Sequence, residues 1–251
     1  MPLPPPVLDV RRAADRFRTR SPGVRSAHSF SFGRHYDSAN TSHGLLLAHN
    51  DIEVDPGAGF DSHPHRDMEI VTWVLQGSLL HEDSTGHSTV ITPGLVQRMS
   101  AGSGIQHAET HAAQGRPAAG SGPVRFVQMW VAPDVRGSEP GYAQQEVGDQ
   151  LAGSALVPVA SGLPRHAHAA IALGSRAAAL HAARLQPGRS VELPDAPYVH
   201  LFLAQGEADL EGAGHLDEGD AVRVTGTGGQ RVTAARASEL LVWEMHAALD
   251  A

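Results

Sequence analysis

The amino-acid sequence predicts an all-β protein built from two tandem β-sandwich or jelly-roll domains. Three observations favour this class: the apolar residues come in short runs between turn residues, no long helical stripe separates the runs, and a second series of runs repeats the shape of the first. The chain contains 27 glycines and 17 prolines among 251 residues, a larger share than the roughly 12% of average proteins. It therefore turns often, while its length suits one or two domains.

The first series of runs predicts the strands of an N-terminal domain. Each run is short, contains β-branched or aromatic residues, and ends at Gly, Pro, Asn, Asp or Ser. No apolar stripe of helical period interrupts the runs, which disfavours a parallel sheet with crossover helices. The strands are expected within residues 28–36, 43–54, 69–82, 87–94, 95–102 and 123–133.

A second series of runs predicts a C-terminal domain of the same kind. It contains a turn at Gly206 and another at Gly219–Asp220. A segment rich in small and turn residues at 134–155 separates the two series, so we expect one domain over residues 1–140 and another over residues 150–251. The strands of the second domain are expected within residues 178–193, 198–212, 220–226, 230–237 and 238–245.

The composition excludes several kinds of chemistry. All 19 cationic side chains are arginines, against 27 Asp and Glu, and the net charge is −8 with neutral histidines. A negative chain without a basic face is not expected to bind nucleic acid directly. The absence of lysine removes Schiff bases, pyridoxal phosphate anchors and P-loops. Because the chain also lacks cysteine, a transition metal would have to bind His, Asp or Glu.

Targeting and membrane signals are not found in the sequence. The start of the chain has no apolar signal-peptide core, and no run approaches the length of a membrane span, which is about 18 apolar residues. We therefore expect a cytoplasmic protein that does not contact membranes.

Histidine is the unusual residue of this chain, with 16 copies, ten of them before residue 112. Residues two apart on a strand face the same side, so His63 and His65 project together, as do His107 and Glu109. Pro64 fixes the backbone φ angle between the first two histidines. If the two strands face each other, three imidazoles and a carboxylate converge, a donor set suited to divalent transition metals. The alternative is that the histidines cluster by chance in a histidine-rich chain. The spacing of two residues occurs in both motifs, His-x-His and His-x-Glu, and this repetition favours the metal site.

Three further side chains leave alternatives open. Glu69 shares strand parity with the first histidine pair, so it could replace Glu109 as the carboxylate ligand. His81 is more simply interpreted as a solvent-facing strand residue. His111 is more simply interpreted as a residue at the rim of the site.

The second half of the chain offers no matching ligand set. His200 is the lone histidine of its strand, and we interpret it as a satisfied or exposed side chain. His166 and His168 repeat the spacing of two, but no His-x-Glu pair follows them, and their segment is expected at the surface. We therefore expect one metal per chain.

Five stretches of the first half together resemble the pirin family of two-domain cupin proteins. They are HSFSFG at 28–33, HGLLLAHND at 43–51, HPHRDMEIVTWVLQG at 63–77, HEDSTG at 81–86 and MSAGSGIQHAE at 99–109. The resemblance covers about residues 25–133, and the second half resembles the family's degenerate second cupin. It implies two cupin domains, also described as double-stranded β-helix or jelly-roll domains, with a single metal in the N-terminal one.

Carried over by position, the resemblance implies four metal ligands and leaves Glu69 as a non-ligand. Fe(II) is the metal we expect first, with Mn, Co, Ni, Cu and Zn as alternatives. Two residues depart from the family pattern: Leu95, where an acidic residue is common, and His111, where a non-ligand such as Asn is expected. The implied ligands are His63, His65, His107 and Glu109.

The resemblance also implies two alternative functions. Several bacterial relatives open flavonols as quercetin 2,3-dioxygenases. We therefore expect a flavonol or related enediol and O2 as substrates, with Glu109 as the base that accepts the substrate's hydroxyl proton. The alternative is a non-catalytic, iron-binding regulator that acts through protein partners, like the nuclear member of animals.

A third hypothesis is a cupin isomerase or another cupin enzyme acting on a sugar or keto acid. Such a protein needs a cation directed into the barrel, and neither Arg66 nor Arg98 can be placed inward from the sequence.

If the protein is the dioxygenase, we expect it to be a monomer. We also expect Ser103, Gln128 and Trp130 to line its pocket or to orient the metal ligands.

Overall fold

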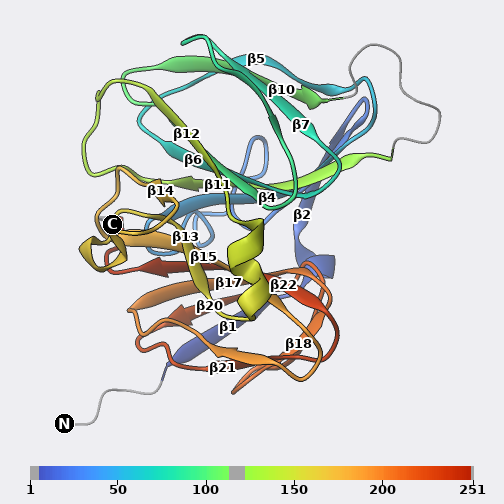
Figure 1. Ribbon diagram of the computed structural model, residues 1–251, viewed down its shortest axis with the longest axis vertical. Helices are drawn as coiled ribbons and strands as arrows, with labels where there is room; N and C mark the ends of the chain where they lie inside the picture. The colour runs from blue at the N-terminus through green and yellow to red at the C-terminus, as the bar shows by residue number, and fades with distance from the viewer. Residues whose placement is uncertain (1–5, 113–121, 250–251) are drawn as a thin grey trace. The chain divides into compact units, whose positions relative to one another are not determined.

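Strands form most of the structure, a computed structural model that describes residues 6–112 and 122–249 (Figure 1). The helices of the described part are three short 3-10 segments, η1 (Ala13–Asp15), η2 (Gly148–Gly153) and η3 (Pro164–His166). None of these described helices is long and apolar enough to cross a membrane. The all-β prediction is confirmed.

The chain divides into two compact units, which we call the N-terminal and the C-terminal unit. The N-terminal unit consists of Phe17–Asn40 and Leu47–Gly148. The C-terminal unit consists of Met1–Arg16, Thr41–Leu46 and Asp149–Ala251.

The units differ in three places from the expected domains over 1–140 and 150–251. The N-terminal unit continues to Gly148, and two segments of the first half belong to the C-terminal unit. The first strand of the chain belongs to the C-terminal unit, because β1 (Val7–Arg11) pairs with β20 (Ala221–Thr225). The short segment Thr41–Leu46 joins the same unit, where His43 contacts the backbone carbonyl of Val199 at 3.1 Å through Nε2. The spacing of the residues in the sequence does not predict that either segment belongs to the C-terminal unit.

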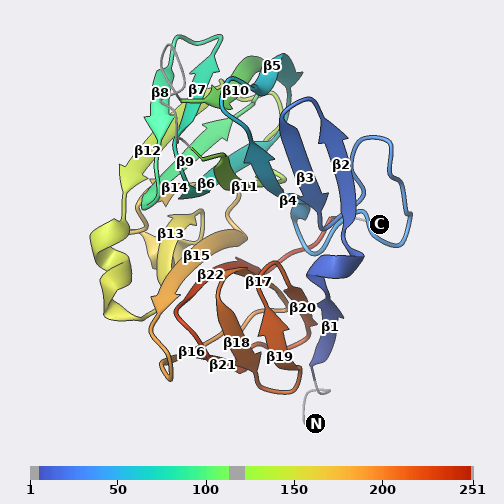
Figure 2. The same ribbon diagram turned by 90° about the vertical axis from the view of Figure 1, so that its right-hand side faces the viewer.

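Two antiparallel sheets form the N-terminal unit (Figure 1). The larger has the strand order β12-β9-β6-β11-β4-β3-β2, and the smaller has the order β5-β10-β7-β8. Figure 2 shows the strands of the smaller sheet side by side. The strands are β2 (Phe17–Ser21), β3 (Val24–His28), β4 (Leu46–Val54), β5 (Gly59–His65), β6 (Glu69–Gln76), β7 (Leu79–Asp83), β8 (Ser88–Ile91), β9 (Leu95–Ser100), β10 (Ile105–His111), β11 (Val124–Val131) and β12 (Gly141–Glu146).

The C-terminal unit repeats this arrangement of a larger and a smaller sheet. Their strand orders are β1-β20-β17-β22-β15-β13-β14 and β16-β21-β18-β19. All pairs are antiparallel except β13 with β14. The remaining strands are β13 (Val157–Ser161), β14 (Ile171–Ala172), β15 (Ala178–Leu185), β16 (Ser190–Glu192), β17 (Tyr198–Gln205), β18 (Glu207–Leu210), β19 (Gly214–Asp217), β21 (Arg231–Ala234) and β22 (Ser238–Met245).

Alternating side chains of both sheets build the core of each unit. In the N-terminal unit, Val54 and Phe126 of the larger sheet belong to one buried cluster with Leu79 and Ile91 of the smaller sheet. Residues of one parity on a strand share a face, so the residues between them are directed away from this core. The same alternation decides which side chains reach a site between the sheets.

The strand expected at residues 28–36 is wrong. β3 ends at His28, and β-bridges within residues 29–36 are limited to the one between Phe32 and His35. Gly33 has a φ of 58°, a left-handed conformation that interrupts an extended chain. Because Phe30 is only 1% exposed, this loop buries an apolar side chain that resembles a strand position in the sequence.

Gly206, at the expected turn between β17 and β18, provides a test of the fold. Its φ is 87°, and a Cβ atom there would lie 2.2 Å from the carbonyl oxygen of Ala237. We expect Gly206→Ala to lower the free energy of unfolding by about 3 kcal/mol, from left-handed strain and overpacking together. Gly214→Ala is the matched control, since Gly214 has a φ of 81° and open space around it. It should lose only about 1 kcal/mol. Equal losses in urea unfolding would contradict the role of the carbonyl contact.

Candidate metal centre

The pairing of β5 with β10 brings the two histidine motifs together. In this antiparallel pair His63 lies opposite His107, and His65 lies opposite Ile105. Pro64 has no backbone N–H to donate, and β5 is an edge strand of its sheet, where proline is tolerated. The alternation along β5 directs both histidines to one side and leaves Pro64 exposed.

A glycine allows β5 to lie close to β10 next to the motif. A Cβ atom on Gly59 would lie 2.5 Å from the carbonyl oxygen of Glu109. The register of the pair shifts between His107 and Glu109, as it does at a β-bulge. This irregularity is invisible in the residue spacing, and it sets how the side chain of Glu109 lies relative to the histidines of β5.

Three imidazole rings form a compact triangle. The ring centroids are 4.5 Å apart for His63 and His107, 4.9 Å for His63 and His65, and 4.9 Å for His65 and His107. One ring nitrogen from each residue can be chosen so that all three lie within 4.8 Å of one another. The predicted convergence of the histidines is therefore present in the structure.

The environment of the triangle favours neutral imidazoles with free lone pairs. The Nδ1 of His63 donates to the carbonyl oxygen of Asp61 at 2.8 Å, which leaves its Nε2 available. The Nε2 of His65 and both ring nitrogens of His107 are buried without a hydrogen-bond partner. Burial lowers the pKa of His65 to about 4 and, together with the neighbouring histidines, that of His107 to about 2. Neutral imidazole is the form that binds metals.

Glu109 is buried beside the histidines and is held by one amide. Gln128 on β11 donates from Nε2 to Oε2 of Glu109 at 2.7 Å, and Trp130 donates from Nε1 to Oε1 of Gln128 at 3.1 Å. The other carboxylate oxygen, Oε1, has no partner. Burial raises the pKa of Glu109 to about 7, although the hydrogen bond from Gln128 acts in the opposite direction.

His81 forms a second group with two of the expected ligands. Its β7 position lies opposite Glu109, and its ligand atom lies within 4.8 Å of those of His107 and Glu109. His107 therefore belongs to two groups of possible ligands. The first consists of His63, His65 and His107, and the second consists of His81, His107 and Glu109. The interpretation of His81 as a solvent-facing residue is wrong, since it is 1% exposed; β7 directs it inward with the parity of Leu79.

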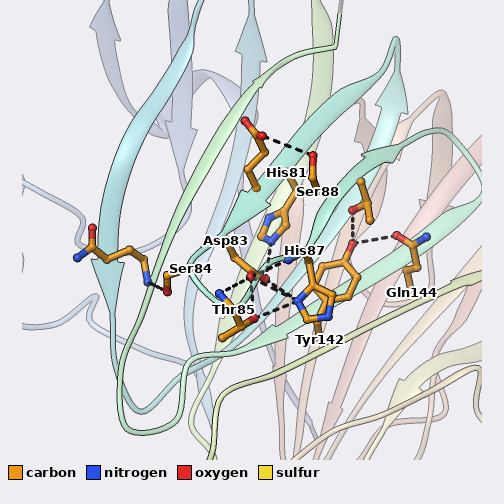
Figure 3. A network of polar contacts seen from close by, with 11 residues as sticks. His81, Asp83, Ser84, Thr85, His87, Ser88, Tyr142 and Gln144 are labelled. Atoms are coloured by element: carbon orange, nitrogen blue, oxygen red, sulfur yellow. Dashed lines mark hydrogen bonds and ion pairs between the residues drawn. The ribbon is translucent and has the colours of Figure 1, made fainter.

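Asp83 organises the turn behind His81 (Figure 3). Its Oδ1 accepts hydrogen bonds from the backbone and hydroxyl of Thr85, and its Oδ2 lies 3.1 Å from Nδ1 of His87. Burial would raise the pKa of Asp83, but hydrogen bonds from Thr85, from the backbone of His87 and from His81 lower it to about 2. Figure 3 also shows Tyr142 beside His87, with ring centroids 4.4 Å apart. The network fixes the hairpin from which His81 projects.

The remaining expected site residues lie apart from the centre. The carboxylate of Glu69 is 3.8 Å from the guanidinium of Arg98, and Glu69 belongs to neither of the two groups described for this centre. His111 ends β10, and its Nε2 donates to the carbonyl oxygen of Gly122 at 3.0 Å. Ser103 is exposed and lines a surface pocket that also includes His65 and Gln106. Its expected role as a pocket or orienting residue stays a prediction.

A cavity of about 400 Å³ opens next to the centre. Its walls combine the aromatic rings of Phe32, Phe60 and Trp130 with a few polar groups, among them Asn50 of β4. His63, His65 and Glu109 also line it. Gln128 and Trp130 are among the residues expected at the pocket, whereas Phe32 is not, since it lies in a loop where the sequence predicts a strand.

The cavity has the dimensions and polarity of a small-molecule site. Such sites usually measure about 300–1,000 Å³ and combine mainly apolar walls with a few polar groups. Phe32 meets Trp130 edge-on at a centroid distance of 5.3 Å, and Trp130 meets His65 edge-on at 4.8 Å. The aromatic wall therefore continues directly into the histidine triangle.

Comparison with known proteins gives two family matches that together span most of the chain. Residues 10–131 match the family model described as pirin, and residues 159–245 match the model described as the quercetinase C-terminal cupin domain. A Mycobacterium tuberculosis protein provisionally named a quercetin 2,3-dioxygenase is 54% identical over 242 residues, covering 96% of both chains. The quercetin 2,3-dioxygenase of Escherichia coli K12 is 35% identical over 151 residues, covering 60% of this chain and 62% of the relative.

Solved structures agree with the fold. The bacterial pirin YhhW of Escherichia coli in complex with nickel(II) superposes with a TM-score of 0.84 at 24% identity, covering 96% of this chain and all of that one. A quercetin 2,3-dioxygenase of Acinetobacter baumannii gives a TM-score of 0.70 at 22% identity, covering 90% of this chain and 81% of that one. With two tandem cupin domains and a 54% identical relative across almost its whole length, the chain belongs to the pirin family.

Proposed function

We propose that the N-terminal unit is a metal-dependent dioxygenase that opens a flavonol such as quercetin, or a related enediol, with O2. The observation that carries this proposal is the direct contact between the histidine triangle and an aromatic-walled cavity. The names of the relatives from Mycobacterium tuberculosis and Escherichia coli support the same reaction class.

The donor set fits a divalent transition metal. Buried polar atoms without partners cost about 1–3 kcal/mol each, and such atoms occur on His65, His107 and Glu109. A cation would satisfy them together, and nitrogen and carboxylate donors suit Fe, Mn, Co, Ni, Cu or Zn. We assign His63, His65, His107 and Glu109 as the ligands and Fe(II) as the expected ion, with His81 as the alternative fourth donor.

The bound metal would supply Lewis acidity and, with a redox-active ion, a path for electrons between the substrate and O2. The protein's own part is to position the substrate and move one proton. Trp130, Phe32 and Phe60 present rings against which a flat aromatic substrate can lie. Their apolar faces also exclude water from the substrate side of the histidines.

Glu109 is the group suited to receive the substrate's hydroxyl proton. Its pKa of about 7 is close to neutral pH, where a general base works best. Gln128 holds the carboxylate through Oε2 and leaves Oε1 without a hydrogen-bond partner, so Oε1 is the atom that would serve either the metal or the substrate's proton. Trp130 in turn fixes the orientation of the Gln128 amide.

The cavity favours catalysis over the alternative of an iron-binding regulator. A regulator that acts through protein partners needs no small-molecule cavity at its metal, whereas an enzyme does. The isomerase hypothesis finds no support in the described cavity, because its lining contains no arginine. Arg66 is largely exposed and Arg98 lies beside Glu69.

Turnover of quercetin tests the proposed activity directly. With Fe(II) loaded under O2, we expect flavonol loss, O2 uptake and CO release in a ratio of one to one to one. The metal-free protein is the control. Flavonol binding without CO release, with any of the candidate metals, would instead favour the regulator.

Replacing Glu109 and Glu69 one at a time shows which of the two carboxylates acts as the base. Glu109→Gln keeps the shape and a weak oxygen donor but removes basicity, so we expect turnover to fall by about 10²–10⁴-fold. Most of the metal should remain on the three histidines. Glu69→Gln is the matched control, because Glu69 pairs with Arg98, and its turnover should stay close to wild type. The reverse order of effects would exchange the roles of the two carboxylates.

Loss of one imidazole should weaken metal binding and its stabilising effect. Because a ligand that binds only the folded state raises stability, added Fe(II) should raise the Tm of the wild type. We expect a clearly smaller rise in His63→Ala or His107→Ala at the same metal concentration. His215→Ala, which changes a half-exposed histidine of the C-terminal unit, should respond like the wild type. A rise as large as that of the wild type in both ligand variants would contradict the histidine centre.

A further inference from the structure

The C-terminal unit contains a polar cluster at one end of an otherwise apolar barrel. Its core consists of residues such as Ala183 and Leu185 of β15 and Leu240 and Val242 of β22. His181 has the parity of the β15 core residues, and Glu244 has the parity of the β22 core residues. Both are buried, at 5% and 1% exposure. Two ionisable groups inside an apolar barrel require partners.

Four donor groups meet at this position. Nε2 of His181 lies 2.8 Å from Oε2 of Glu244, and Nε2 of His246 lies 2.6 Å from Oε1. The rings of His166 and His181 meet edge-on at 5.1 Å. The ligand atoms of His166, His181 and Glu244 all lie within 4.8 Å of one another. This is the same closeness as in the histidine triangle of the N-terminal unit.

The local contacts leave donor atoms available. Ser161 Oγ lies 3.2 Å from Nδ1 of His166, which fixes the ring and leaves its Nε2 for another partner. Nδ1 of His181 is buried without a hydrogen-bond partner.

Arg165 is the present counter-charge of the buried carboxylate. Its guanidinium contacts Oε1 of Glu244 from η3. The side chain of Arg165 is 53% exposed, so it can leave for solvent at little cost, unlike the buried residues it covers. A divalent cation would neutralise Glu244 and also satisfy the nitrogens of His166 and His181, whereas the histidine contact of Arg165 is to Nε2 of His246 at 3.1 Å.

We propose that His166, His181 and Glu244 form a second, zinc-class metal site in the C-terminal unit, with His246 as a further donor. Two or three imidazoles and one carboxylate are a typical donor set for Zn²⁺, Co²⁺ or Ni²⁺. Arg165 occupies the carboxylate in the metal-free state and is displaced on binding. This revises two expectations: His166 is half-buried within the cluster rather than at the surface, and the second barrel does contain a ligand set. His168 is exposed as expected.

Metal stoichiometry in the full-length chain tests the proposal. The double variant His63→Ala/His107→Ala disables the N-terminal centre, so the probe ions Zn²⁺ and Co²⁺ report on the C-terminal unit alone. Equilibrium dialysis followed by elemental analysis should give one ion per chain in this variant and two in the wild type. Saturation of the wild type at one ion, with none retained by the double variant, would overturn the proposal.

Two neighbouring histidines provide a matched pair of variants. In the double-variant background, His166→Ala should weaken Zn²⁺ binding by at least about tenfold, since even residues that only orient a ligand cost 10–100-fold. His168→Ala, two residues away and exposed, should bind as the background does. Both are partly or fully accessible positions outside the barrel core, so folding should survive. Equal weakening in the two variants would contradict the assignment.

Arg165→Gln distinguishes the metal site from a purely structural ion pair. Removing the competing cation should tighten Zn²⁺ binding, because the ion no longer has to displace a guanidinium from Glu244. The visible absorption of bound Co²⁺ should show nitrogen and oxygen coordination in the background variant and disappear in Glu244→Gln. Weaker Zn²⁺ binding after Arg165→Gln, or an unchanged Co²⁺ spectrum after Glu244→Gln, would overturn the proposal.

Discussion

The antiparallel pairing of β5 with β10 is the interaction on which the candidate metal centre depends. It places His63 opposite His107 and brings His65 within 5 Å of the same ring. Gly59 allows the two backbones to approach at the register shift. The histidine triangle is thus a consequence of strand register, and a slip of β5 by one residue would direct both of its histidines to the opposite face.

Burial determines the chemical character of the groups that this pairing brings together. It keeps His65 and His107 neutral and raises the pKa of Glu109 towards neutrality. In a metal-free protein these shifts cost free energy, because the groups lose water without gaining partners. A bound cation would recover this free energy, because it would give the buried nitrogen and oxygen atoms a partner. The same cost applies to the buried cluster around Glu244 in the C-terminal unit, where Arg165 contacts the carboxylate.

Much of the fold and the histidine triangle could be predicted from sequence because both rest on a period of two. Strands such as β6 and β22 coincide with apolar runs, and the motif histidines are two residues apart. The loop at Phe30 and Phe32 was missed since alternating Ser and Phe resemble a strand until Gly33 turns the chain. His81 was missed because a single histidine carries no periodic signal.

The donors of the C-terminal unit escaped prediction for a different reason. His166, His181 and Glu244 are far apart in the sequence and come from η3, β15 and β22, so no local motif links them. Their meeting depends on the antiparallel pairing of β15 with β22 and on the turn that carries His166. Such sites need the tertiary structure, whereas the His-x-His and His-x-Glu motifs are visible in the sequence alone.

The side chains that hold the metal of the N-terminal unit can be identified in a crystal structure of the metal-loaded protein, with the ion located by its anomalous scattering. We expect an ion bound by imidazole nitrogens of His63, His65 and His107 and by a carboxylate oxygen of Glu109, at about 2.0–2.2 Å. An ion bound by His81 and lacking the histidines of β5, or an ion elsewhere in this unit, would contradict it.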